Sequence, residues 1–137
     1  VWSFNHRASK FGSNVSGNTI DAISFYGDWF GGNNERCIVA GDFNNSIIWD
    51  KKGNDNNFKN INDHFVNLGF VSNYHKLKDE GFGRESSGTF FHTKKESKKY
   101  HIDYIYSKNL NPLELKVGSY SEWISYSDHS PLIAELG

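Results

Sequence analysis

The chain has 137 residues, and 15 lysines and arginines stand against 16 aspartates and glutamates, so its formal net charge is -1. This near-neutral charge excludes a global attraction to nucleic acid; a polyanionic ligand would need a local group of cations or a bound metal ion. Hydrophobic residues make up 36% and aromatic residues 16% of the sequence, which is typical of a globular domain with a well-packed sheet.

Signals for membrane insertion or export are missing from the sequence. No apolar run approaches the roughly 18 residues that a membrane-spanning helix needs. The first five residues lead at once into polar sequence, unlike a signal peptide. Cys37 is the single cysteine, so no internal disulfide can form. We therefore expect no membrane span, and a cytoplasmic location is the default expectation.

The first half of the chain predicts alternating strands and helices. Residues 1–5 are apolar and predict a short strand, and an apolar stripe at three- and four-residue steps predicts a helix over residues 20–30. Residues 36–41 form a continuous apolar run, typical of a strand that is buried on both faces. An Asn-rich loop over residues 44–57 follows, and residues 58–68 then predict a second helix that Gly69 ends.

The second half predicts mainly strands, over residues 70–75, 89–93, 100–107, 113–120 and 131–136, with a loop over residues 76–88. The second and third of these strands flank the basic tract Lys94–Lys99 and predict a hairpin with a long turn. This order of elements predicts an α/β (α+β) fold, in which a mixed sheet carries helices on one face. No linker divides the chain, so residues 1–137 are expected to belong to one domain.

Polar residues follow the predicted buried strand at Gly41–Asp42–Phe43–Asn44. Ligands of open α/β sheets gather beyond the carboxyl ends of strands. In an extended backbone Asp42 and Asn44 point the same way and Phe43 points into the core. The carboxylate can orient a water molecule, and the amide can donate to a phosphoryl oxygen. A simple turn is the alternative interpretation, because Gly, Asp and Asn all favour turns.

Two further aspartates stand near histidines. His101 and Asp103 share one face of a predicted strand, where the aspartate is either solvent-exposed or accepts a hydrogen bond from a histidine ring. Asp128 and His129 lie in the loop that enters the last strand. A carboxylate binds hard cations through oxygen, and a histidine, with an unperturbed pKa of about 6.5, is a natural general base. Alone, each pair is weak evidence.

The three motifs, with Thr89–Phe91 between the first two, occur in the order that is found in the endonuclease/exonuclease/phosphatase (DNase I-like) superfamily. The resemblance covers essentially the whole chain and suggests a role for each residue. By resemblance, Asp42 orients or activates water, Asn44 stabilises the transition state, Asp103 pairs with the histidine, His129 is the general base or a phosphate ligand, Asp128 helps to bind the metal, and Thr89 supports the Gly-Asp-Phe-Asn region.

The resemblance implies a metal-dependent phosphodiester hydrolase, foremost a nuclease, with Mg²⁺ or Mn²⁺ as cofactor and nucleic acid or another phosphodiester as substrate. One alternative is a phosphatase that acts on phospholipid or small phosphoesters, because the sequence has no long basic stripe. The other is a catalytically weak or inactive binding domain of the same fold. Trp2, where relatives carry a histidine or tyrosine, favours this second alternative.

More narrowly, the sequence resembles uncharacterised bacterial members of the superfamily. The residues that carry this likeness are Trp2–Ser3, Trp49–Asp50, Ser72–His75, Gly83–Glu85 and Tyr100–His101. Outside the motifs, His64, His75 and His92 are expected to be surface or hydrogen-bonded histidines, and Cys37 is expected to fill the core.

A complete domain of the superfamily is a four-layer β-sandwich of roughly twice this length. The resemblance therefore implies that residues 1–137 are its C-terminal half. The start at Val1 and the lack of methionine agree with an absent N-terminal half, which in the family supplies an Asn and a Glu to the metal site. We expect that half, or a second copy, to cover an apolar sheet face. Asn5 and His6 are further candidates for substrate-binding or supporting residues.

Overall fold

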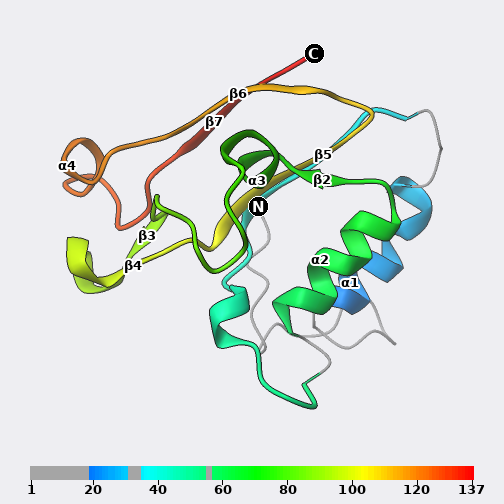
Figure 1. The fold of residues 1–137 in the computed structure, drawn as a ribbon, viewed down its shortest axis with the longest axis horizontal. Helices are drawn as coiled ribbons and strands as arrows, with labels where there is room; N and C mark the ends of the chain where they lie inside the picture. The colour runs from blue at the N-terminus through cyan, green and yellow to red at the C-terminus, as the bar shows by residue number, and fades with distance from the viewer. Residues whose placement is uncertain (1–18, 31–34, 55–56) are drawn as a thin grey trace.

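The computed structural model describes residues 19–30, 35–54 and 57–137 (Figure 1). Its elements are α1 (Thr19–Phe25), η1 (Gly27–Phe30), β1 (Cys37–Asp42), η2 (Ile47–Trp49), α2 (Phe58–Asn67), β2 (Val71–Ser72), α3 (Asn73–Lys78), β3 (Phe90–Phe91), η3 (His92–Lys94), η4 (Glu96–Lys98), β4 (Lys99–Tyr100), β5 (Asp103–Lys108), β6 (Pro112–Val117), α4 (Tyr120–Trp123) and β7 (Leu132–Leu136). The predictions for the strand at residues 1–5, Trp2, Asn5 and His6 lie outside the described residues. No helix in the described ranges has the length and apolar character to cross a membrane.

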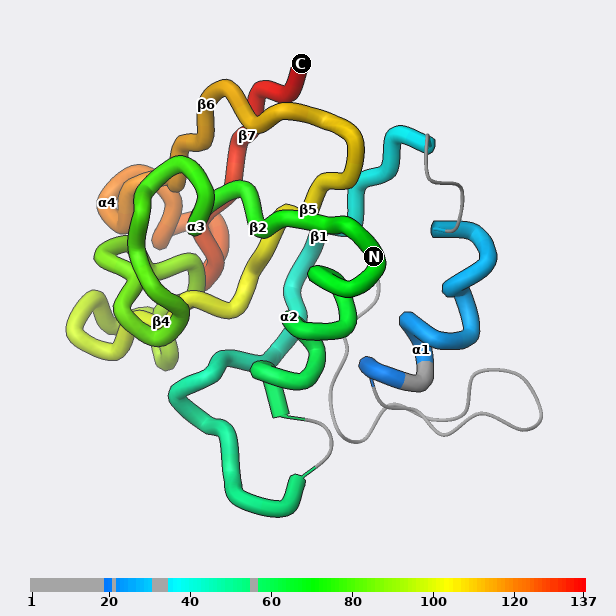
Figure 2. Tube along the Cα trace, turned by 45° about the vertical axis from the view of Figure 1, so that its right-hand side comes forward, coloured from blue at the N-terminus to red at the C-terminus, as the bar shows by residue number. Residues whose placement is uncertain are grey.

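The described strands form three antiparallel sheets. A central sheet has the order β1-β5-β2, and β3–β4 and β6–β7 form one two-stranded sheet each. Because every pairing between described strands is antiparallel, the mixed sheet expected from the sequence is not found among them. In both Figure 1 and Figure 2, α1 and α2 lie together on one side of β5, and the β6–β7 hairpin lies on the other. The fold is thus α+β.

Aromatic side chains fill the core between α2 and the central sheet. Phe58 and Phe65, on one face of α2, stack on Tyr104 and Tyr106 of β5, with ring centroids 4.6 and 4.5 Å apart. All four rings are at most 1% exposed. Phe43, which follows β1, packs edge-on against Phe65 with the centroids 5.9 Å apart. The high aromatic content of the sequence therefore serves one core.

Helix α2 begins and ends as its sequence predicts, but its N-terminus has an unexpected partner. The Asp50 carboxylate accepts hydrogen bonds from the backbone N–H groups of Phe58 (2.6 Å) and Lys59 (3.0 Å). These amides have no partner within the helix, and a negative charge here also interacts favourably with the helix dipole. Gly69 ends the helix region with a φ of 87°, which glycine adopts without a steric penalty. Asp50 therefore ties the loop after β1 to α2.

The predicted burial of the first central strand on both faces is wrong. Cys37 and Val39 pack against the core, whereas Ile38 is 52% exposed and Ala40 is exposed. Alternate residues of a strand point to opposite faces, so one face of β1 adjoins the core and the other is open. Asp42 ends the strand on this open face.

Two predicted strands are shorter than expected. The strand over residues 70–75 is limited to β2, and the chain then enters α3, where the neighbours Asn73 and Tyr74 are both buried. The Ser107 hydroxyl of β5 donates to Asn73 Oδ1 at 2.6 Å, which anchors the start of α3 on the sheet. The strand over residues 100–107 is divided: β4 pairs with β3, and β5 pairs with β1 and β2. The predicted helix over residues 20–30 likewise divides into α1 and η1.

Candidate active site

Two aspartates face each other at the end of the central sheet. The register of β1 and β5 places Asp42 directly opposite Asp103. Residues opposite each other in an antiparallel pair point to the same face, and like charges there repel. Each carboxylate is therefore expected to have a partner that lowers this repulsion, and each has one.

Asp42 is paired with Asn44. The Asn44 backbone N–H donates to Asp42 Oδ1 at 2.7 Å, and the Asn44 side-chain amide donates to Oδ2 at 2.9 Å. Asn44 has a φ of 48°, in the left-handed region that asparagine tolerates better than most residues. The two side chains thus meet because the chain turns, and not because they alternate along an extended strand as expected. The turn and the side-by-side placement, which were alternative interpretations of this motif, occur together.

Asp103 is paired with His129. The His129 Nδ1–H donates to Asp103 Oδ2 at 2.9 Å, with the two side chains 30% and 17% exposed. Burial raises the pKa of Asp103 above its ordinary value of 3.8, against the opposing effect of hydrogen bonds from Thr89 and His129. Because Nδ1 carries the proton, Nε2 of a neutral imidazole keeps its lone pair. The structure therefore brings together the Asp-His pair that the resemblance implied.

Backbone hydrogen bonds hold the loop of His129 against β3. Phe91 N–H donates to Asp128 C=O, and Ser130 N–H donates to Thr89 C=O, both at 2.8 Å. The His129 N–H donates to the Ser127 hydroxyl at 2.9 Å. The orientation of the His129 ring therefore depends on β3 as well as on Asp103.

Thr89 supports the aspartate of this pair. Its side chain is fully buried, and its Oγ1 accepts hydrogen bonds from the backbone N–H groups of Ile102 (3.0 Å) and Asp103 (3.1 Å). These bonds replace strand pairing where the chain passes from β4 to β5. Thr89 was expected to support the region of Asp42; its hydrogen bonds fix the start of β5, where Asp103 lies opposite Asp42.

A pocket of about 470 Å³ opens beside the Asp103–His129 pair on the open face of the sheet. Its polar lining comes from Asp103, His129, Ser127 and Ser130, and its apolar lining includes Ala40 and Trp123. Since these residues come from β1, β5, α4 and the loop before β7, the pocket depends on the tertiary fold.

The described residues do not by themselves form a metal site. In the described ranges, no group of three or more His, Cys, Asp or Glu side chains could hold a metal ion. Asp128 is half-buried, and its carboxylate makes no hydrogen bond or ion pair with another described residue. One such carboxylate is compatible with a cation ligand, but it does not supply the several oxygen ligands that Mg²⁺ or Mn²⁺ takes.

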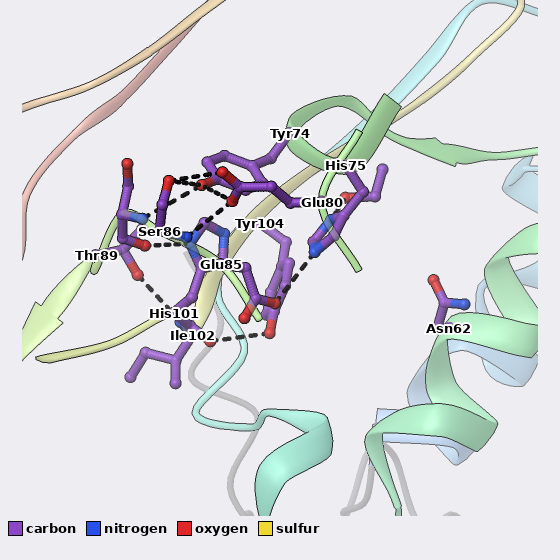
Figure 3. Close-up of polar contacts among 12 residues, drawn as sticks. Asn62, Tyr74, His75, Glu80, Glu85, Ser86, Thr89, His101, Ile102 and Tyr104 are labelled. Atoms are coloured by element: carbon purple, nitrogen blue, oxygen red, sulfur yellow. Dashed lines mark hydrogen bonds and ion pairs between the residues drawn. The ribbon is translucent and has the colours of Figure 1, made fainter. Parts of the chain in front are cut away.

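Side chains from three sequence motifs meet in a hydrogen-bonded network next to Thr89 (Figure 3). Ser72 Oγ lies 2.7 Å from His75 Nδ1, and His75 Nε2 lies 3.1 Å from Glu85 Oε1. His101 Nδ1–H donates to Ser87 C=O at 3.0 Å. The likeness to bacterial relatives at residues 72–75, 83–85 and 100–101 thus reflects one structural unit. As predicted, His75 is hydrogen-bonded.

His101 does not share the face of Asp103, which corrects the expectation from strand alternation. It is 5% exposed, its ring lies 4.4 Å from that of Tyr74, and burial lowers its pKa below the ordinary value of 6.5. The reason is that β5 begins only at Asp103, so the alternation does not extend back to His101.

The network also contains residues that the sequence did not single out. Glu80 accepts hydrogen bonds from Tyr74 OH, Ser86 N–H and Ser86 Oγ–H, at 2.7, 2.8 and 2.7 Å. Glu80 and Ser86 belong to no recognisable sequence motif, and the charged, glycine-containing composition of residues 76–88 predicts only a loop. A tertiary contact between this loop and α3 was needed to identify them.

Acid is expected to destabilise the protein through this network. Hydrogen bonds from Ser86 and then Tyr74 lower the pKa of Glu80 from 4.5 to about 2. Burial alone would raise the pKa of Glu85, but hydrogen bonds from His75 and from backbone amides lower it below 4.5. A carboxylate whose pKa is lowered by folding stabilises the folded state above its unfolded pKa, and this contribution is lost as the pH falls through the folded pKa.

Urea unfolding of the wild type between neutral pH and about pH 3 should therefore show falling stability below about pH 4.5. Glu80→Gln should show a smaller loss over the same range, because glutamine does not titrate. Glu96→Gln, which changes an exposed glutamate of η4, should follow the wild type. Equal acid losses in Glu80→Gln and the wild type would exclude Glu80 as a source of the effect.

Comparison with known proteins adds one finding to this geometry. A family model described as "Endonuclease/Exonuclease/phosphatase family" matches residues 12–129. No curated protein and no solved structure matches the chain. The matched residues include both members of each pair, Asp42 with Asn44 and Asp103 with His129.

Proposed function

Because the chain belongs to the endonuclease/exonuclease/phosphatase family, whose members hydrolyse phosphoester bonds, we propose that it hydrolyses phosphodiesters and that nucleic acid is its substrate. The observation that carries this proposal is the hydrogen bond between His129 Nδ1 and Asp103 Oδ2, across the sheet end from the Asp42–Asn44 pair. A base and two polar groups that can contact a phosphoryl group therefore lie on one open rim.

His129 is the proposed general base. Its Nε2 would take a proton from the attacking water, and the Asp103 carboxylate would stabilise the imidazolium that forms and hold the ring in one orientation. The hydrogen bond from Thr89 to Asp103 and the contacts of the His129 loop with β3 support this arrangement. Proton transfer then needs no large movement of the ring.

Asp42 and Asn44 are the proposed phosphoryl-side residues. Asp42 would orient the attacking water, and the Asn44 amide would donate to a phosphoryl oxygen on which charge develops. The hydrogen bonds between the two residues, at 2.7 and 2.9 Å, support this role because they hold both groups before substrate binds.

Enzymes of this family generally use divalent metal ions, which supply positive charge at the phosphoryl group. We propose that Mg²⁺ or Mn²⁺ is required and that Asp128 is one ligand. Since the described residues do not complete a metal site, the other ligands would come from outside them. We also propose that the described sheets form part of a four-layer sandwich, and that the segment or second copy that covers the open face of β1 supplies these ligands.

Hydrolysis assays test this function directly. The protein should cleave labelled DNA or RNA, or the simple diester bis(p-nitrophenyl) phosphate, in the presence of Mg²⁺ or Mn²⁺. Chelation with EDTA should reduce cleavage to background, and re-addition of the ion should restore it. Asp42→Ala should cleave more slowly, and exposed Asp63→Ala in α2, as its control, should not. Equal residual activity in the wild type and Asp42→Ala would contradict the enzyme and favour a binding domain of the same fold.

A further inference from the structure

A row of aromatic rings extends from His129 to the surface. The Phe90 ring lies 4.8 Å from the ring of His129 and 6.4 Å from that of Tyr100, and the planes of Phe90 and Tyr100 differ by 27°. The Trp49 ring lies 5.2 Å from Tyr100. These residues come from η2, β3, β4 and the loop before β7, so only the fold puts them in a row. The rings therefore form one continuous row from His129, the proposed general base, to Trp49.

The outer end of the row is exposed. Trp49 is 42% exposed and its neighbour Ile48 is 52% exposed, although both are large hydrophobic residues. Beside them lies a hollow of about 110 Å³, which Ile48, Lys99, Tyr100 and the buried Glu85 and His101 help to line. An exposed aromatic ring next to a hollow with polar walls offers a ligand both an apolar contact and hydrogen-bonding groups.

Cations stand beside the aromatic row. Lys94, Lys95, Lys98 and Lys99 are all exposed, and they lie between β3 and β4 or at the start of β4. Lys99 Nζ donates to the Ser86 carbonyl at 2.9 Å. For the other three lysines, no salt bridge to a described residue is present. A chain of net charge -1 therefore carries four lysines against the single Glu96 in the segment that joins Phe90 to Tyr100.

We infer that Trp49 and Tyr100 form a base-stacking platform for a single-stranded stretch of nucleic acid. This inference rests on the proposed function and specifies its substrate. The platform would hold the base of a nucleotide near the scissile bond. The backbone phosphates would run along the lysines, and the scissile phosphate would lie at His129. Every base has a π face, so stacking on exposed rings is tolerant of sequence, and lysines supply the salt-dependent attraction to the backbone.

A single strand fits these features better than the other phosphodiester substrates. In a duplex, both faces of each base are covered by neighbouring bases. Trp49 could stack on a base only after that base had been unpaired and unstacked, which costs free energy. A phospholipid headgroup or a small phosphoester has no aromatic face that would use the exposed ring of Trp49. Aromatic rings combined with a positive groove are typical of proteins that bind single strands.

Binding can be measured separately from cleavage. The probe is a fluorescein-labelled single-stranded DNA of about 12 nucleotides, titrated with protein in EDTA so that no cleavage occurs, and read by fluorescence anisotropy. Trp49→Leu keeps an apolar side chain without a π face, and should weaken binding by about 10- to 100-fold. Trp49→Phe should retain most of the affinity. Trp29→Ala changes an 83% exposed tryptophan in η1 and should bind as the wild type does.

The salt dependence tests the lysines. Lys95→Gln and Lys98→Gln should each lower the slope of log Kd against log salt by about 0.7 for the single strand, whereas Lys59→Gln in α2 should leave it unchanged. The same DNA as a duplex should bind with equal affinity to the wild type and Trp49→Leu. Wild-type affinity of Trp49→Leu for the single strand would overturn the inference. So would an equal loss of duplex affinity in Trp49→Leu.

Failure of the proposed function gives a different result. If no phosphodiester were cleaved under any condition but Trp49→Leu still lost affinity for the single strand, the platform would stand as a binding site without the hydrolase. If cleavage depended on Asp42 but binding did not depend on Trp49, the hydrolase would stand without the platform.

Discussion

Replacing His129 with alanine is expected to lower kcat for phosphodiester hydrolysis by about 10²- to 10⁴-fold, the usual contribution of a positioned general base. The reason is that in the proposed mechanism Nε2 of His129 takes the proton of the attacking water, while Nδ1 is held by Asp103 at 2.9 Å. Rates are measured on bis(p-nitrophenyl) phosphate with Mg²⁺ or Mn²⁺, with circular dichroism to verify folding. His64→Ala, in α2, is the matched control and should keep wild-type activity.

The partner of His129 should behave as part of the same unit. Asp103→Asn should also lower kcat, and the double variant should lose little more than His129→Ala alone, because residues that act together are not additive. In the wild type, burial raises the pKa of Asp103 above 3.8, and the ionised form is the one that orients the ring. Activity should therefore fall with decreasing pH, with an acidic limb above pH 3.8. Additive losses in the double variant would contradict a shared role.

Replacing Phe43 with alanine is expected to lower the free energy of unfolding by about 3–5 kcal/mol, the usual cost of a large cavity in a core. Phe43 is 1% exposed, and its ring contacts Phe65, Tyr104 and Tyr106 at centroid distances of 5.9, 5.4 and 5.9 Å. Urea unfolding followed by tryptophan fluorescence measures the loss. Val66→Ala removes a 55% exposed residue of α2 and should change stability by no more than about 0.5 kcal/mol.

Phe43 also connects stability to the site, because it stands between Asp42 and Asn44. Phe43→Leu keeps most of the apolar volume and should lose less stability than Phe43→Ala, but both should lower activity if the core holds the turn in place. A stable Phe43→Ala protein, with an unfolding free energy within about 1 kcal/mol of the wild type, would show that the ring is not needed in the core.

The sequence predicted local structure best where the local signal was strong. Helix α2 has apolar residues at helical spacing and a glycine after its end, and it was predicted almost to the residue. The strand over residues 70–75 was predicted too long, since only Val71–Ser72 form β2, because in a short apolar segment alternation does not distinguish a strand from the start of a helix. There the hydrogen bond between Asn73 and Ser107, which are far apart in the sequence, favours the start of helix α3.

The candidate site followed from the order of its motifs, since Asp42, Asn44, Asp103 and His129 were selected by resemblance to one family. Their roles remain predictions. What no spacing could reveal is how they meet: Asp42 and Asp103 by strand register, and His129 and Asp103 across 26 positions of chain. The support from Thr89 to the start of β5 and the Glu80–Ser86–Tyr74 contacts were equally hidden.

By itself, then, the sequence determined the family, the aromatic character of the core and the candidate residues of the site, because these depend on composition, short motifs and their order. Only the tertiary structure decided which face of β1 is open, where His101 lies, and that Trp49, Tyr100 and Phe90 form a row toward His129. Such features depend on contacts between segments distant in the chain, which periodicity along one segment does not encode.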